Sequence, residues 1–405
     1  MKSLISKIYN FIKNKFLVKI DKKHGITFVS IFVSVFIVLA AATLCAATHP
    51  NYVYIETEED LELIRNDLDG DFIFLKQNIE ITSKWTPIGS LEEPFTGTID
   101  AKGCTISFIE SETTPLTSNE TSYFGFFGKN SGTIKNLNFY MHSLTVESVG
   151  SNLVFGNICA FNDGSISKCN VIQASNSIKL YSDFNVTAGG ICGIGSHNFI
   201  SNSSSTRFDI YSAKTVIAGG IIGELNKDLN MVECKSTASI FVQYSDNLLG
   251  GGLVASVSGS ETVNIQNSYV RSSFEGFAAN YSVFSGVIGS SISADISLKN
   301  IYSNCVFTFR EAQNYSNFVG GGTFKISNCV SNPVFNYIHA NSNYGSFCFK
   351  SYYGILIENS FYTNLYDNSF EEYGEYKPLQ DISLKLLKWD NKIWRKDENG
   401  HFYLI

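Results

Sequence analysis

A glycine-based phrase recurs along most of this chain at intervals of about thirty residues. Small apolar clusters are built on it, at Gly125, Gly156, Gly190, Gly220, Gly251, Gly286, Gly320 and Gly345. The steps between these glycines are 31, 34, 30, 31, 35, 34 and 25 residues. A repeat in this range is typical of solenoid proteins, in which each unit buries its apolar side chains against its neighbours. We therefore expect one stacked array rather than a set of independent globular domains.

A second phrase follows the glycine clusters: an aliphatic residue with Asn two places further on. Its asparagines are Asn136, Asn202, Asn267, Asn300, Asn328 and Asn359. Between the phrases, apolar and polar residues alternate, so that Leu137, Phe139 and Met141 would share one face of a strand. Asn tolerates the left-handed backbone conformation, and its amide can bond to an Asn stacked on the next coil. The repeat predicts an all-β parallel β-helix, in which each strand pairs with the equivalent strand one coil away.

The composition favours strands and argues against nucleic acid as a partner. The chain has 21 Tyr, 32 Phe and 6 Pro among 405 residues, and charged residues make up 17%, below the usual quarter. The formal net charge is −7, and beyond the N-terminus Lys and Arg do not cluster. Binding to nucleic acid requires clustered basic residues that neutralise phosphates, so we expect none.

The first 48 residues have a charge distribution typical of a membrane anchor. Lysines crowd residues 1–24, at Lys2, Lys7, Lys13, Lys15, Lys19, Lys22 and Lys23, whereas residues 25–48 carry no charge. About twenty apolar residues span a bilayer as a helix, and basic residues hold their side in the cytoplasm. We interpret 1–24 as cytoplasmic and 25–48 as a transmembrane signal-anchor, with the body outside the cell. A cleaved signal peptide is the alternative, and the body would then be secreted.

Both ends of the body differ from the repeats in 111–365 and are expected to cap the solenoid, whose terminal coils otherwise expose strand edges. The first region, 51–110, holds the first coils and a short helix predicted near 57–66, with Thr57 and Asp60 in a capping box and its glutamates on a solvated face. The second region, 366–405, is expected to close the other end. The tryptophans lie in these two regions and are interpreted as cap-packing residues: Trp85, Trp389 and Trp394.

Several segments resemble the GLUG-motif surface proteins. They are 85–89 (WTPIG), 95–106 (FTGTIDAKGCTI), 123–128 (YFGFFG), 132–137 (GTIKNL) and the tail 394–404 (WRKDENGHFYL), together with the glycine and asparagine phrases. The resemblance extends over nearly everything after about residue 55 and departs from the common pattern at Ala101 and Lys102. It implies a right-handed parallel β-helix that is secreted or attached to the cell surface and acts as an adhesin.

The cysteines and histidines do not form a metal or redox motif. No C-x-x-C pair occurs, and the histidines are scattered without metal-ligand spacing, so we expect no metal and no cofactor. Cys169, Cys305 and Cys329 follow the asparagine phrases and are interpreted as small residues in a recurring interior position. Disulfides between adjacent coils are the alternative outside the cell, and no pair is assigned.

An enzyme that cleaves polysaccharides would need two carboxylates on neighbouring strands or coils. The candidates in the body are Asp163, Asp183, Asp209, Glu233, Asp246 and Asp295. They fall at unrelated repeat positions and are not joined by a Lys, Arg or His cluster, so we do not expect an enzyme. We expect a membrane-tethered extracellular adhesin or binding scaffold whose ligand is an unidentified protein or glycan. The alternatives are a polysaccharide lyase or hydrolase and a passive coat or spacer protein.

Overall fold

A computed structural model describes residues 52–108, 113–173, 177–259, 262–291, 294–308, 314–337, 342–348, 355–364 and 374–405. The predicted cytoplasmic segment 1–24 and the predicted anchor 25–48 lie outside these residues. Among the helices within the described ranges, none has the length and apolar composition needed to cross a membrane. The body, Val53–Ile405, forms one compact unit.

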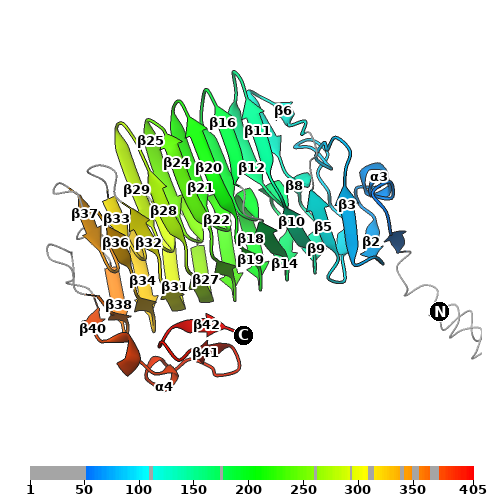
Figure 1. The fold of residues 1–405 in the computed structure, drawn as a ribbon. Helices are drawn as coiled ribbons and strands as arrows, with labels where there is room; N and C mark the ends of the chain where they lie inside the picture. The colour runs from blue at the N-terminus through cyan, green and yellow to red at the C-terminus, as the bar shows by residue number, and fades with distance from the viewer. Residues whose placement is uncertain are drawn as a thin grey trace, which may run out of the picture. The chain divides into compact units, whose positions relative to one another are not determined.

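The body is a right-handed parallel β-solenoid of about seven turns, as the repeat predicts (Figure 1). Each coil adds strands to a nine-stranded, a seven-stranded and a 24-stranded sheet, here called the large sheet. Equivalent strands of neighbouring coils pair in parallel and in register, for example Leu153 with Val186 and Val186 with Val216. Side chains therefore stack in rows along the axis, one row for each repeat position.

From the coil of β7 (Thr121–Phe124) onward, two of the sheets hold one strand from each coil, and the nine-stranded sheet also holds β6 (Leu116–Ser118), which pairs antiparallel with β7. The nine-stranded sheet contains β6, β7, β12 (Asn152–Gly156), β17 (Val186–Gly189), β21 (Thr215–Gly219), β25 (Asn247–Gly251), β29 (Tyr281–Ser285), β33 (Asn314–Ser316) and β37 (Asn343–Gly345). The seven-stranded sheet contains β11 (Leu144–Ser148), β16 (Ile178–Ser182), β20 (Arg207–Ser212), β24 (Ser239–Tyr244), β28 (Ser273–Gly276), β32 (Val306–Thr308) and β36 (Val334–Asn336).

The large sheet bends twice within each coil and so has three walls. The first wall contains β8 (Phe127–Asn130), β13 (Cys159–Asn162), β18 (Cys192–Ile200), β22 (Ile222–Val232), β26 (Val254–Val257) and β30 (Ile288–Ser291). The second contains β1 (Val53–Ile55), β2 (Asp71–Phe74), β4 (Thr98–Asp100), β9 (Thr133–Lys135), β14 (Ser165–Ser167), the later halves of β18 and β22, β27 (Thr262–Val270), β31 (Asp295–Ser303), β34 (Thr323–Ser327) and β38 (Ile355–Glu358). The third contains β3 (Asn78–Ile81), β5 (Thr105–Phe108), β10 (Asn138–Met141), β15 (Asn170–Gln173), β19 (Ser203–Ser204), β23 (Lys235–Ser236), the ends of β27 and β31, β35 (Val330–Ser331), β39 (Phe361–Tyr362) and β40 (Glu375–Tyr376).

Glycine allows the tight turn from the nine-stranded sheet into the large sheet. The strand register places these residues at equivalent positions: Gly156, Gly189, Gly219, Gly251, Ser285, Ser316 and Gly345. A Cβ on Gly219 would overlap the carbonyl oxygen of Ile222, three residues on, so a side chain has no room in that turn. The alignment of the repeats from the sequence alone differs from this register. Gly190, Gly220 and Gly286 lie one residue after the turn position of their coils. Gly320 lies further along its coil, because the preceding residue, Val319, already bridges to Ile288 of the first wall.

The later glycine of each pair serves a different purpose. A Cβ on Gly190 would collide with the backbone oxygen of Gly220 in the next coil and with the hydroxyl of Ser204, which lies on the opposite wall of the same coil. Gly220 meets Ser236 in the same way, one coil further on. The interior is therefore narrow at this point, and two consecutive glycines are needed for two separate reasons.

The bend between the second and third walls uses a left-handed residue in every coil. Positive φ angles occur in register at Lys102, Asn136, Lys168, Ser201, Glu233, Asn267, Asn300, Asn328 and Asn359. At two of these bends an Asn Nδ2 donates to Oδ1 of the Asn one coil earlier, over 2.8 Å from Asn300 to Asn267 and 2.7 Å from Asn359 to Asn328. Among the described residues, Asn300 Oδ1 is buried without a hydrogen-bond partner, so Asn328 does not continue this ladder. The Asn phrase at Asn202 is out of register with the others, because Ser201 makes the bend in that coil.

Asn202 instead occupies a buried position directly after the bend. The same position holds Cys104, Leu137, Cys169, Asn202, Cys234, Ser268, Ile301, Cys329 and Ser360, all of them buried. In four coils the side chain at this position accepts a backbone N–H from the preceding coil, for example from Cys169 N to Asn202 Oδ1 over 2.9 Å and from Cys329 N to Ser360 Oγ over 3.0 Å. Small polar residues recur here because this N–H would otherwise be buried without a partner.

This position also corrects the grouping of the cysteines. Cys169 and Cys329 share it with Cys104 and Cys234, whereas Cys305 lies further along its coil. There, Cys305 N donates to Asn317 Oδ1 over 3.3 Å, and the Cys305 thiol contacts the backbone of Ser272. The cysteines within the described ranges are buried, and none of them forms a disulfide.

The solenoid interior is filled by rows of aliphatic and aromatic side chains. Phe274 and Phe307 stack with ring centroids 5.1 Å apart, and Phe307 and Phe335 with centroids 5.2 Å apart. Each such pair adds roughly 0.5–1.5 kcal/mol beyond the burial of its surface. The repeating interior therefore stabilises each coil mainly through its two neighbours.

A short helix lies at the N-terminal end of the body, as predicted (Figure 1). Helix α3 (Leu61–Asn66) buries Leu61 and Ile64 in the core. Thr57 N donates to Asp60 Oδ2 over 3.0 Å and Asp60 N to Thr57 Oγ1 over 3.3 Å, which is the reciprocal arrangement of a capping box. Trp85 packs below the helix: its ring stacks on Phe126 with centroids 4.8 Å apart.

One glutamate of this segment is not simply solvated. Glu58 accepts hydrogen bonds from the backbone and hydroxyl groups of Thr82 and Ser83, the shortest at 2.5 Å from Ser83 Oγ. Partial burial acts to raise the pKa of Glu58, but these hydrogen bonds outweigh it and lower the pKa. The carboxylate therefore ties the start of α3 to the turn after β3.

The C-terminal segment lies along the side of the solenoid and not over its end. It comprises a 3-10 turn (Leu379–Asp381), α4 (Leu384–Leu387), β41 (Trp394–Lys396) and β42 (Phe402–Leu404). Trp389, Trp394 and Phe402 pack on outward residues of successive coils in the third wall, namely Tyr269, Tyr302, Val330 and Phe361. Figure 1 shows β41 and β42 beside β27 and β31. Trp389 and Trp394 thus cover a lateral face, because aromatic residues point outward there.

Candidate binding groove

A groove runs parallel to the axis where the nine-stranded sheet meets the first wall of the large sheet. The outward row of the nine-stranded sheet, Val154, Thr187 and Ile217, leans toward the small outward residues of the first wall. A Cβ on Gly193 would lie 2.7 Å from Val154 Cγ1, so glycine permits this approach. The two sheets therefore meet at a concave corner on the outside of the solenoid.

The groove has a volume of about 450 Å³ and crosses four successive strands of the nine-stranded sheet, β7, β12, β17 and β21. Its floor and one side are largely apolar, from Val154, Ile217, Phe161 and Ile194. Leu91 lies at its N-terminal end, where its backbone N–H lies 3.4 Å from the hydroxyl of Tyr123. A concave, mostly apolar surface with a few polar groups is the usual form of a binding site.

Amide and hydroxyl side chains line the opposite rim. They are Ser118, Asn119, Thr121, Asn152, Asn185 and Thr215, whereas Thr187 lies in the floor row between Val154 and Ile217. Asn185 Nδ2 donates to Asn152 Oδ1 over 3.1 Å, and Thr215 N donates to Asn185 Oδ1 over 3.2 Å, so the asparagines are held in place by the adjacent coils. Among the described residues, the hydroxyls of Thr121, Thr187 and Thr215 have no protein hydrogen-bond partner.

Charge is almost absent from the groove. Of the residues that line it, Glu224 is the one carboxylate, and no Lys or Arg lines it. Glu224 occupies the row of Phe161 and Ile194 on the first wall. The six acids that the sequence suggested for catalysis are not among the lining residues.

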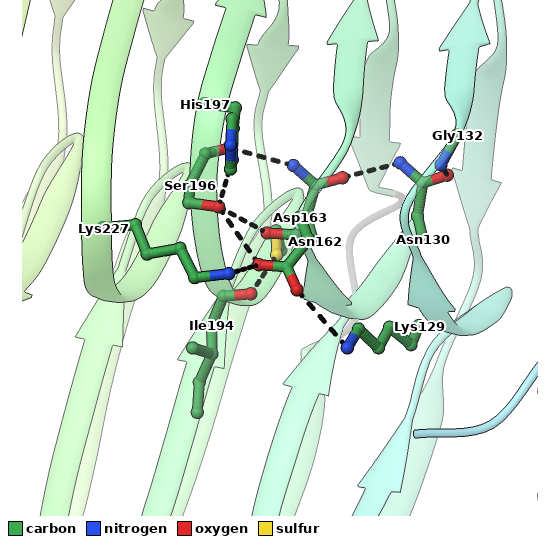
Figure 2. A network of polar contacts seen from close by, with 10 residues as sticks. Lys129, Asn130, Gly132, Asn162, Asp163, Ile194, Ser196, His197 and Lys227 are labelled. Atoms are coloured by element: carbon green, nitrogen blue, oxygen red, sulfur yellow. Dashed lines mark hydrogen bonds and ion pairs between the residues drawn. The ribbon is translucent and has the colours of Figure 1, made fainter. Parts of the chain in front are cut away.

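The same row begins at Lys129, which belongs to a polar cluster at the edge of the groove (Figure 2). Asp163 lies between two lysines, with Lys227 Nζ 2.8 Å from Oδ1 and Lys129 Nζ 3.3 Å from Oδ2. Burial acts to raise the pKa of Asp163, but Lys227 and Lys129 outweigh it and lower the pKa. We expected no Lys, Arg or His cluster to join the candidate acids, and at Asp163 the two lysines correct this expectation.

A ladder of side-chain amides supports this cluster from inside the bend. Asn130 Nδ2 donates to Asn162 Oδ1 over 2.6 Å, and Asn162 Nδ2 donates to the backbone oxygen of Ser196 over 3.1 Å. Figure 2 shows the ladder crossing three coils behind Asp163. All three residues are almost completely buried, so the ladder fixes the position of the bend rather than offering groups to a ligand.

Ser196, His197 and Asp163 lie together but do not form a catalytic triad. Ser196 Oγ lies 2.6 Å from His197 Nδ1 and 3.3 Å from Asp163 Oδ1, so the serine bridges the other two residues. In a triad the histidine bridges the serine and the acid. Ser196 has 0% exposure and also donates to the Asn162 carbonyl over 3.1 Å. The cluster therefore has a structural role, in which its hydrogen bonds connect neighbouring coils.

The remaining candidate acids are distributed over other faces. Asp183, Asp209 and Asp246 lie on or beside the seven-stranded sheet, where Asp209 Oδ1 accepts from Gln243 and Asp246 Oδ1 accepts from the Tyr244 hydroxyl. Glu233 makes the bend of its coil, and Asp295 begins β31. The fold does not bring these acids together.

An aromatic row crosses the outer face of the seven-stranded sheet. Tyr181, Tyr211, Tyr244 and Phe277 follow one another with ring centroids 6.4, 6.0 and 5.7 Å apart. Because neighbouring rings lie within 37° of parallel, each ring covers the face of the next. The pocket beside Tyr181 and Tyr211 has a volume of about 230 Å³, which is smaller than that of the groove, so the groove is the stronger candidate site.

The groove residues were not predicted from the sequence. The outward-pointing residues of each alternating strand are the signal that could have found them. In three coils, an Asn or Thr points away from the core, and two residues later an apolar residue or a Thr does the same. These positions recur in 152–156, 185–189 and 215–219. An outward apolar row that recurs in several coils indicates a surface that another group covers or binds.

Comparison with known proteins adds little to this site. No known protein family matches the chain, and no curated protein matches it. The resemblance to GLUG-motif proteins therefore gains no support from these searches. Among solved structures, one similar chain is described as "a putative immunoglobulin A1 protease from Bacteroides ovatus", with 15% identity over 87% of this chain and 91% of that chain and a TM-score of 0.38. A likeness this distant carries no functional inference.

Proposed function

We propose that the protein is a surface-exposed binding scaffold, adhesin-like in use, whose ligand lies in the axial groove. The observation that carries the proposal is the groove itself: an apolar floor with a rim of hydroxyl and amide groups, repeated over four coils. A solenoid suits such a role because stacked coils present an extended, rigid surface. One carboxylate lines the groove, whereas glycoside hydrolysis uses a pair, so we propose binding rather than cleavage.

The location is also part of the proposal. The basic segment 1–24 and the uncharged segment 25–48 support a single-pass anchor with the body outside the cell. Protease treatment of intact cells that express the full chain, followed by N-terminal sequencing of the undigested protein, tests this. We expect the body to be digested from outside while residues 1–24 are retained. A body that is protected until the cells are lysed would contradict an external location.

The binding role is tested with the purified full-length protein and a panel of bacterial and animal cells. We expect saturable binding to at least one cell type. A second β-solenoid of similar size, with no outward apolar groove, serves as the control for non-specific adsorption. Binding no greater than this control on every cell type would contradict the proposal and would favour a passive coat or spacer.

A further inference from the structure

The groove extends along the solenoid axis across four successive coils. Its lining residues come from four successive coils, and parallel neighbours are spaced about 4.8 Å apart, so the four rows span about 14 Å. Each coil contributes the same kinds of group at the same positions: a hydroxyl or amide on the rim and a side chain on the floor. A ligand that repeats at a similar interval can make the same contacts in every coil.

A peptide cannot use this groove through its backbone. Recognition of an extended peptide by a sheet requires a free strand edge. The strands that form the groove run across it, and their backbone groups pair with the coils on either side. The groove therefore presents side chains only, and a bound chain must be recognised through its own side groups.

The groups that are present match a polyhydroxylated ligand. The free hydroxyls of Thr121, Thr187 and Thr215 can each donate and accept, as sugar hydroxyls do. Val154 and Ile217 offer an apolar floor to the C–H face of a sugar ring. The length of one hexose unit in an extended chain is close to the spacing of the coils, so successive units can meet the rim residues Thr121, Asn152, Asn185 and Thr215 of successive coils.

The charge of the groove selects among polysaccharides. Since no Lys or Arg lines it, an acidic glycan would place its carboxylates beside Glu224 without a compensating cation. We propose that the groove binds an uncharged linear polysaccharide, about four sugar units at a time. This inference rests on the proposed function and names the ligand class of the same groove.

The test is a titration of the full-length protein, followed by calorimetry, with neutral linear β-linked hexose oligosaccharides of two to eight units. We expect the affinity to rise with each added unit up to about four and then to level off. Oligomers of a uronic acid with the same linkage should bind at least tenfold more weakly, and added salt should leave the neutral affinity unchanged.

Two variants that remove only a hydroxyl test the contacts directly. Thr187→Val and Thr215→Val should each weaken binding about tenfold, because each removes one hydrogen bond while keeping the shape. Ser167→Val, on the outer face of β14 and away from the groove, should leave the affinity unchanged. Equal effects of all three variants, or no dependence on chain length, would overturn the proposal.

The outcomes separate this inference from the proposed function. If cells bind through the groove but no neutral glycan does, while an acidic glycan or an extended peptide competes, then the ligand class is wrong and the binding role stands. If neither cells nor glycans bind, both are wrong. Cleavage of any of these oligosaccharides during the titration would also overturn the inference, since the inference assigns binding without cleavage to the groove.

Discussion

Lys227 Nζ lies 2.8 Å from Asp163 Oδ1, although one whole coil separates β22, which carries Lys227, from β13, which ends one residue before Asp163. The contact exists because the register between β18 and β22 shifts between Gly195 and His197, where β22 is longer. The extra residues carry Lys227 outward and back over the intervening coil (Figure 2). One ion pair therefore links three coils at the edge of the groove.

Replacing Lys227 with Ala should lower the free energy of unfolding by less than about 1 kcal/mol, because the pair is partly exposed. The loss should shrink as salt concentration rises. Urea titrations at low and high salt measure both effects. Lys299→Ala, which removes an exposed lysine from the outer face of β31, is the control. A loss of stability that does not depend on salt, or the same loss in the control, would contradict a stabilising role for this ion pair.

Asp100 should make the stability of the protein depend on acid pH. Partial burial acts to raise its pKa, but hydrogen bonds from Lys102 and Asn136 and the charge of Lys135 lower the pKa to about 2. The pKa of Asp in an unfolded chain is about 3.9. The stabilisation of the fold by ionised Asp100 is therefore complete above that pH and is lost as the pH falls through about 2.

The variant Asp100→Asn tests this. Its stability should be about 1 kcal/mol below that of the parent protein near neutral pH, and the difference should close as the pH approaches about 2. Denaturation midpoints across this range are the measurement. A difference that does not change with pH would show that the lost hydrogen bonds, and not the charge, determine the effect.

Gly219→Ala should destabilise the protein severely, because the new Cβ would overlap the Ile222 carbonyl oxygen in the tight turn. We expect a loss of more than about 3 kcal/mol, as for other steric clashes in a packed backbone. Gly150→Ala is the matched control: its φ is +76°, but nothing lies within 4 Å of the added carbon, so it should cost only about 1 kcal/mol. Thermal unfolding compares the two.

Cys329 should tolerate Ser better than Ala. Its sulfur accepts the N–H of Ile301 over 3.4 Å and donates to the Ser327 carbonyl over 3.2 Å, and Ser360 makes the equivalent bonds one coil later. Cys329→Ala should therefore lose roughly 1–3 kcal/mol, because a buried N–H is left unpaired. Equal stability of the Ala and Ser variants in chemical denaturation would contradict this account of the position.

The repeat period alone indicated the solenoid, because only stacked coils can use a unit of about thirty residues with so small a core. The register within the coil could not be read in the same way. Gly189 and Gly190 are both required, one for the turn and one for the approach of Ser204, so the sequence does not show which is equivalent to Gly156. Asn202 matched the asparagine phrase but lies one position past the bend.

The lateral position of the C-terminal segment was missed for a different reason. Tyr269 and Tyr302 alternate correctly with buried neighbours, and outward aromatic residues in one repeat position could have indicated a covered face. The groove likewise depends on how two sheets lean together, which alternation within one strand does not specify. Asp163 and Lys227 come together only through a local change of register. These features are set by contacts between coils and not by the repeat itself.

The most direct test of the central claim uses a cell type to which the protein binds. The measurement is the affinity of the protein for these cells after a substitution has filled the groove with a larger side chain. Ile217→Lys places a long charged side chain on the groove floor, whereas Ile172→Lys makes the same change on the outer face of β15, where Ile172 is 51% exposed. The account predicts that Ile217→Lys weakens binding at least tenfold while Ile172→Lys leaves it unchanged, with similar unfolding temperatures for both. Equal affinities for the two variants would contradict it.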